Sequence, residues 1–296
     1  MKRLKKIGSI VGLVVVSGGL IHSVSYTKPA AKTEAFERYY PSEMDFAGEK
    51  TPLELADVKE RFDRELIVNS NLDASTLIII KRANREFPII EPILKKYGVP
   101  DDFKYLAVAE SALFNATSSA GAKGFWQFMP ATAKERGMEV TDEVDERYHL
   151  VKSTEAACQY ILNAKEKMGS WTLAAASYNG GLAGVNRQIT SQGENNYYDL
   201  LLTEETYRYV FRILALKEVM QHPVLYGFTY RNNELYNGIP TRKVEVDSSI
   251  ADLAAFAKEE GINYKILKIH NPWLRDKKLT NSSKKKYVIE IPTSGY

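Results

Sequence analysis

The chain has very little cysteine and histidine: Cys158 is the only cysteine, and four histidines are scattered over 296 residues. A single cysteine excludes an intramolecular disulfide, and its apolar helical surroundings predict a small buried side chain rather than a nucleophile. The histidines lack metal-ligand spacing, so nothing supports a zinc site or a Ser-His-Asp triad. Neither a P-loop nor a dinucleotide-binding glycine motif is present, and we expect no cofactor and no metal.

The sequence also has no large excess of positive or negative charge. The formal net charge is +3, with 26% charged residues and 44% hydrophobic residues. Four of the cations lie within the first six residues, so the rest of the chain is close to neutral. A near-neutral globular chain lacks the basic surface that nucleic-acid-binding proteins need, and we expect no nucleic-acid partner.

The N-terminal cations precede an apolar segment, residues 7–21, and the small residues Ser23 and Ser25. This order is typical of a secretory signal peptide, which we predict over residues 1–25. The protein is then exported to the periplasm or cell envelope. The apolar segment is short for a membrane span, and an uncleaved anchor is the alternative; only that alternative predicts an association with the membrane.

The remaining length suggests about two domains. Residues 26–50 are polar and are predicted to be an irregular linker. Residues 51–225 carry a succession of amphipathic helical patterns, one of which we expect to end at Pro88. The acidic residues within 142–146 are expected to form a solvated loop.

The pattern changes in residues 226–296. Two strand-like segments, 243–246 and 287–291, flank two short helical patterns, which predicts a small β-α-α-β module. The expected fold class is therefore α+β and predominantly α-helical, with two domains at 51–225 and 226–296.

Glu110 stands at the end of an apolar helical pattern. Phe103, Leu106 and Glu110 recur at helical spacing, which places the carboxylate on the face of the core residues. A buried carboxylate without a cation beside it is costly to ionise, so its pKa should rise and the group can act as a general acid. The alternative is a helix-end glutamate that turns to solvent, and spacing alone does not decide between them.

Four separated motifs occur in a particular order: Glu110-Ser111, Gly124-Phe125-Trp126-Gln127, Ser177-Tyr178-Asn179-Gly180, and Glu205-Thr206-Tyr207-Arg208-Tyr209-Val210. Together they resemble the lysozyme-like lytic transglycosylases of bacterial cell walls, most closely the group of lytic murein transglycosylase D. The resemblance covers roughly residues 50–225. Phe125, Ser177 and Gly180 depart from the leucine and alanines usual in the family.

The C-terminal residues 226–296 resemble a degenerate LysM module. Asp247-Ser248 stands where these modules usually have a glycine. The resemblance implies a glycan-binding module, and the alternative is a module that only packs on the catalytic domain.

The resemblance implies an activity as well. Glu110 would cleave the β-1,4 bond between N-acetylmuramic acid and N-acetylglucosamine in peptidoglycan glycan strands, acting first as acid and then as base. The C6 hydroxyl of the muramic sugar would be the nucleophile and would leave 1,6-anhydro ends. Two alternatives stay open: a hydrolytic muramidase with a second carboxylate from the acidic loop, and a non-catalytic peptidoglycan-binding protein.

The resemblance also implies a set of substrate-binding residues around Glu110. Gln127 would hold a sugar N-acetyl group, and Tyr178 would hydrogen-bond the Glu110 carboxyl group. The other members, each with a structural alternative, are Ser111 (helix capping), Trp126 (core packing rather than sugar stacking), Asn179 (loop hydrogen bonds) and Tyr209 (helix packing).

Overall fold

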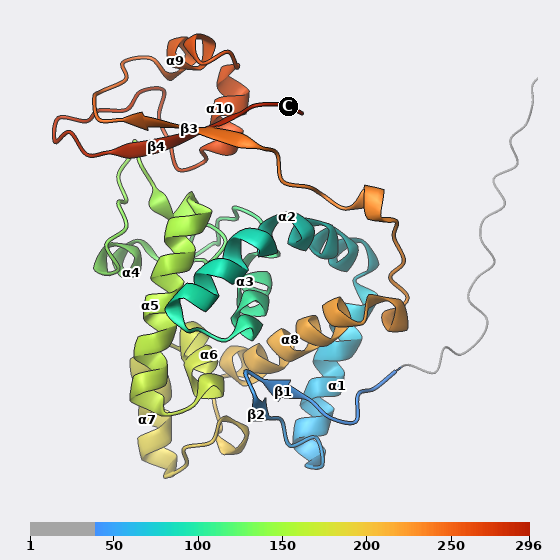
Figure 1. Cartoon of the computed structure of the whole chain (residues 1–296). Helices are drawn as coiled ribbons and strands as arrows, with labels where there is room; N and C mark the ends of the chain where they lie inside the picture. Colours follow the sequence, from blue (N-terminus) through green and yellow to red (C-terminus); the bar gives the residue numbers. More distant parts are fainter. Residues whose placement is uncertain (1–38) are drawn as a thin grey trace, which may run out of the picture. The chain divides into compact units, whose positions relative to one another are not determined.

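The computed structural model describes residues 39–296 (Figure 1). The predicted signal peptide and the first part of the predicted linker lie outside the described residues. The predominantly helical α+β fold is confirmed, with two small antiparallel sheets. In residues 39–296 no helix has both the length and the apolar character needed to cross a membrane.

Helices dominate the described chain. They are α1 (Ala56–Asn71), α2 (Asp73–Tyr97), α3 (Lys104–Ser111), α4 (Pro130–Glu135), α5 (Leu150–Met168), α6 (Trp171–Gly180), α7 (Leu182–Gln192), α8 (Glu204–Gln221), α9 (Leu253–Glu259) and α10 (Tyr264–His270). The strands are β1 (Asp45–Phe46), β2 (Glu49–Lys50), β3 (Thr241–Val246) and β4 (Tyr287–Pro292).

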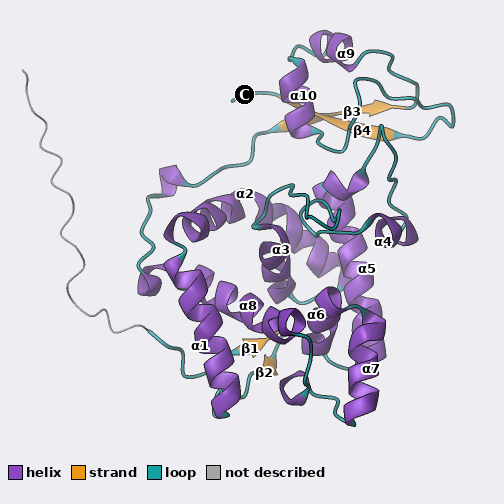
Figure 2. Cartoon of the chain, turned by 180° about the vertical axis from the view of Figure 1, so that it is seen from behind, coloured by secondary structure: helices purple, strands orange, loops and turns teal. Residues whose placement is uncertain are grey.

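Helix α8 forms the centre of the helical domain. Its residues Val210, Phe211, Ile213 and Leu214 are fully buried, and a helix that is apolar on most sides must be surrounded by others. α1, α3 and α6 pack on α8, and Figures 1 and 2 both show it between α1 and α6. The glutamate-bearing α3 is therefore held against the middle of the domain.

Helix α2 differs from the sequence prediction, because it continues through Pro88 and Pro92 as one helix of 25 residues. The predicted end at Pro88 is wrong. Ile80, Ile90 and Leu94 are buried on both sides of the proline, so one apolar face continues past it. Packing of that face offsets the lost backbone hydrogen bond, a cost of roughly 3 kcal/mol.

The end of the predicted linker is part of the helical domain. β1 and β2 form a hairpin, and Phe46 is fully buried with its ring 5.0 Å from that of Phe103. The Glu49 carboxylate accepts hydrogen bonds from the backbone amides of Trp171 and Thr172 at the start of α6. This segment is therefore ordered, in contrast to the irregular linker predicted for it.

The β-α-α-β order of the C-terminal module is as predicted. β3 and β4 pair antiparallel with Val244 opposite Ile289, α10 packs on β4, and α9 packs on α10. Asn263 caps α10 through the amide of Ile266, as a helix start there requires. A second hydrophobic core includes Leu267 and other residues of the module, together with Val144 and Tyr148 from the loop before α5.

Cys158 lies in α5, which packs on α6, and it is fully buried. Burial raises the pKa of its thiol to about 12. The prediction of a buried, unreactive cysteine is confirmed.

Candidate active site

Glu110 is the second-last residue of helix α3 and is partly buried. The chain turns after Ser111, because Ala112 and Leu113 adopt left-handed backbone angles with φ of 52° and 54°. Burial raises the pKa of the Glu110 carboxyl from 4.5 to about 7, against an opposing hydrogen bond from Tyr209. A carboxyl group with this pKa holds its proton at weakly acidic pH and loses it near neutrality, as a general acid that becomes a base requires.

The phenol of Tyr209 is the hydrogen-bond donor to Glu110 Oε1. Tyr209 comes from the first half of α8 and is 2% exposed, so its position is fixed by packing. The helix-packing alternative for Tyr209 therefore holds, and its hydroxyl reaches Glu110 as well.

Arg212 is a neighbour of Glu110 that the sequence analysis missed. Its positive charge lowers the pKa of Glu110, and the charge of Glu205 raises it. Arg212 contacts Glu205 at 3.1 Å and Glu65 at 3.7 Å, so its charge is shared. The available signal was helical spacing, since Arg212 follows Tyr209 by three residues on one face of α8.

Tyr178 does not bond Glu110. Its hydroxyl donates to the backbone oxygen of Trp126 at 2.8 Å, so the predicted hydrogen bond to the carboxyl is wrong and Tyr209 makes it instead. Burial raises the pKa of Tyr178 well above 10, and the charge of Glu110 raises it further, which places the two groups near each other.

Trp126 is fully buried, and its indole nitrogen donates to Thr154 Oγ1 at 2.8 Å. The prediction that it stacks on a sugar ring is therefore wrong, and the core alternative holds. Ser111 is 8% exposed and donates to the carbonyl of Ala107 at 3.1 Å. This bond joins positions i and i−4 within α3, so the predicted helix-capping bond is not formed.

Gln127 lies in the loop between α3 and α4, residues 112–129, which we call the α3–α4 loop. It has a left-handed backbone with φ of 48°, a strained conformation for a residue with a side chain. Its Nε2 donates to the carbonyls of Gly124 at 2.7 Å and Ala116 at 3.2 Å. Both bonds use the amide nitrogen, so neither occupies the carbonyl oxygen of the side chain.

Asn179 links two helices near the site. Its Oδ1 accepts a hydrogen bond of 2.8 Å from Thr206 Oγ1, which joins the end of α6 to the start of α8. The adjacent Gly180 explains one departure from the family pattern. A Cβ there would lie 2.9 Å from Thr206 Oγ1, so the close approach of the helices leaves little room for alanine.

The acidic loop is solvated as predicted at Asp142, which is exposed, and Glu143 is partly exposed. The prediction is wrong for Asp145 and Glu146, which are 3% and 2% exposed. Asp145 pairs with Arg147 at 2.7 Å, and Glu146 pairs with Lys152 and with Lys285. Two of the candidates for a second carboxylate are therefore committed to buried ion pairs.

The chain matches two known domain families. Residues 87–201 match the model of the transglycosylase SLT domain family, and residues 242–295 match that of the soluble lytic transglycosylase C-terminal LysM-like domain family. The first match contains Glu110, Gln127, Tyr178 and Asn179, whereas Tyr209 and Arg212 lie beyond its end.

The similar curated proteins carry a more particular name. Membrane-bound lytic murein transglycosylase D of Escherichia coli K12 is 30% identical over 202 residues, which is 66% of this chain and 44% of that protein. The protein of the same name from Escherichia coli O6:H1 matches equally. The chain thus spans less than half the length of the curated relatives it matches.

Proposed function

We propose that the protein is an exported peptidoglycan lytic transglycosylase and that Glu110 is its catalytic residue. The observation that carries the proposal is the pKa of about 7 of a carboxyl group held by Tyr209 within an SLT domain. The name of the Escherichia coli relatives supports murein as the substrate.

The proposed reaction uses one carboxyl group twice. Protonated Glu110 donates to the oxygen of the β-1,4 bond between N-acetylmuramic acid and N-acetylglucosamine, and the bond breaks through an oxocarbenium-like state. The Glu110 carboxylate then accepts the proton of the C6 hydroxyl, whose oxygen bonds to C1 and closes a 1,6-anhydro ring. No water is consumed, and the proton count of the enzyme is restored.

A single carboxyl group suffices because the nucleophile belongs to the substrate. An intramolecular hydroxyl is already close to C1 and needs less activation than a free water. The burial of Asp145 and Glu146 in ion pairs supports this over a hydrolytic muramidase, which would need one more carboxylate to activate water.

The remaining site residues have three roles in this proposal. The Gln127 carbonyl oxygen binds a sugar N-acetyl group, and Tyr209 orients the acid. Ser111, Tyr178 and Asn179 shape the site through the hydrogen bonds described above.

We also propose the domain division behind this function. Residues 1–25 are a signal peptide, 51–225 form the lysozyme-like catalytic domain and 226–296 contain the glycan-binding LysM-like module. The presence of two hydrophobic cores supports two domains.

Product analysis tests the proposal. The full chain and Glu110→Gln are incubated with purified peptidoglycan, and released fragments are analysed by mass spectrometry. We expect 1,6-anhydro ends from the parent and none from the variant, while Glu135→Gln, an exposed change on α4, leaves the products unaltered. Reducing ends would identify a hydrolase. Binding without any cleavage by the parent would identify a binding protein.

A further inference from the structure

The loop between α4 and α5, residues 136–149, contacts both the C-terminal module and the α3–α4 loop. We call it the α4–α5 loop. Its Val144 and Tyr148 are buried in the hydrophobic core of the C-terminal module. Val144 forms a β-bridge with Leu274, and the amide of Asp145 donates to the carbonyl of Trp273 at 2.9 Å. The module is therefore built around a loop of the catalytic domain.

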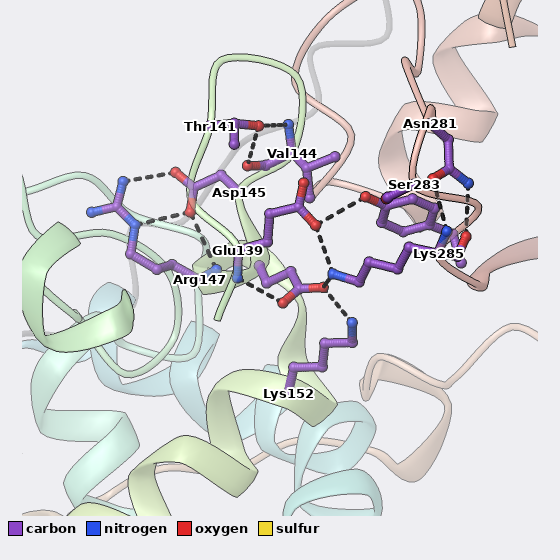
Figure 3. Close-up of polar contacts among 11 residues, drawn as sticks. Glu139, Thr141, Val144, Asp145, Arg147, Lys152, Asn281, Ser283 and Lys285 are labelled. Atoms are coloured by element: carbon purple, nitrogen blue, oxygen red, sulfur yellow. Dashed lines mark hydrogen bonds and ion pairs between the residues drawn. The ribbon is translucent and has the colours of Figure 1, made fainter. Parts of the chain in front are cut away.

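An ion-pair cluster fixes the same contact, and Figure 3 shows it. Lys285 Nζ lies 2.6 Å from Glu139 Oε2 and 3.1 Å from Glu146 Oε1. The hydroxyl of Tyr287 donates to Glu139 Oε2 at 2.9 Å. Lys152 from α5 also pairs with Glu146, so two carboxylates meet two ammonium groups. Removal of Lys285 would leave the buried Glu146 with less compensation.

The α4–α5 loop also contacts the α3–α4 loop, which carries Gln127. Arg147 is 3% exposed and paired with Asp145, and its NH1 donates to the carbonyls of Gly121 and Phe128, each at 3.2 Å. These two carbonyls lie on either side of Gln127 in the α3–α4 loop.

The two loops also touch through their backbones. A Cβ on Gly124 would lie 1.9 Å from the carbonyl oxygen of Arg147, so only glycine permits this approach. Tyr148 and Thr117 add a contact of 3.1 Å between their hydroxyls. A continuous set of contacts thus runs from Lys285 in the module through Arg147 to the loop that carries Gln127.

We propose that the C-terminal module braces the active site, with Arg147 as the positioning residue that transmits its docking to the α3–α4 loop. The inference rests on the proposed function, because it concerns the rate of that reaction. A module that only captures glycan would raise the local substrate concentration. A brace also sets the position of Gln127 and of the Trp126 carbonyl that anchors Tyr178, and so acts on turnover of bound substrate.

Adjacent lysines provide a matched pair of variants. Lys285→Met removes the docking cation, whereas Lys286→Met removes an exposed cation that lies 3.9 Å from Glu245 within the module. Both are assayed as the full chain on intact sacculi and on a soluble tetrasaccharide cut from the same strands, with kcat and KM obtained separately. At saturating tetrasaccharide, capture by the module no longer limits the rate.

We expect Lys285→Met to lower kcat about tenfold on both substrates, because small displacements of positioning groups reduce the turnover of bound substrate. Lys286→Met should match the parent. An unchanged kcat of Lys285→Met on the tetrasaccharide would overturn the brace. Absence of cleavage by the parent chain would instead refute the proposed function, so the two failures are distinguishable.

Two further variants cover a failure of Lys285→Met to fold. Tyr287→Phe removes only the hydroxyl bond to Glu139 and should lower kcat in the same direction, with circular dichroism reporting the fold. Gly124→Ala forces the loops apart, whereas Gly121→Ala adds a methyl group at a similar left-handed φ with no atom within 4 Å. The brace predicts a greater loss of kcat for Gly124→Ala, and equal losses would contradict it.

Discussion

Replacement of Glu110 by glutamine measures how much the partly buried carboxyl group lowers the free energy of unfolding. Burial raises the pKa of Glu110 from 4.5 to about 7, so the folded state favours the protonated form. Glutamine keeps the size of the side chain and an oxygen that accepts the Tyr209 hydrogen bond, but it does not ionise. The variant therefore removes the titration alone.

The sign follows from proton binding. Between pH 4.5 and about 7 the folded state holds a proton on Glu110 that the unfolded chain releases, so the free energy of unfolding of the parent falls as pH rises. Each pKa unit is worth about 1.4 kcal/mol, which gives a loss of up to about 3 kcal/mol above pH 7. Glu110→Gln does not ionise and therefore does not undergo this loss of stability.

Urea unfolding followed by circular dichroism at pH 4 to 8 gives both stabilities. We expect similar values for parent and variant near pH 4 and a difference that grows to roughly 1–3 kcal/mol in favour of Glu110→Gln at pH 8. Glu135→Gln, at an exposed position, serves as the control. A difference that does not change with pH would refute the raised pKa and, with it, the physical basis of the acid role.

Three other outcomes follow from contacts near the site. Tyr209→Phe removes a hydrogen bond that lowers the pKa of Glu110, so the alkaline limb of the pH–activity profile should move to higher pH; a limb that stays in place or moves down would contradict this. Gly180→Ala should destabilise the protein by about 1 kcal/mol in urea unfolding, because the contact with Thr206 outweighs the gain in helix propensity; a more stable variant would show that the helices separate freely. Burial raises the pKa of Glu49, but hydrogen bonds at the start of α6 outweigh this effect and lower it. Glu49→Gln should therefore lower the free energy of unfolding by about 1–2 kcal/mol at pH 7 and by less as pH falls below 4.5. A loss that does not depend on pH would show that the charge of Glu49 does not stabilise the fold.

Local patterns in the sequence predicted most of the helices and the order of the C-terminal module. Gly98 closes α2 with a left-handed φ of 70°, and Asn263 starts α10, because caps depend on a few neighbouring residues. Helix α7 was missed. The predicted break at Pro88 was wrong because packing against other helices overrides a local preference.

The site was predictable to a different degree for each residue. The spacing of Glu110 with Leu106 placed it on the face of the core residues but left its burial open, and its partner Tyr209 is 99 positions away, so no local rule pairs them. For Trp126 the sequence allowed either sugar stacking or core packing, because an aromatic side chain in a family motif fits both. Only its full burial in the structure decides for core packing. The acidic loop looked solvated because its counter-ion Lys285 comes from the far end of the chain.

The buried thiol of Cys158 can report transient opening of the helical domain. With a pKa of about 12 and no exposed surface, it cannot meet an alkylating reagent unless α5 separates from α6. It is also the only thiol in the chain, so every labelled molecule reports one and the same event. The rate of its modification in native buffer therefore measures how often the interior behind the site becomes accessible.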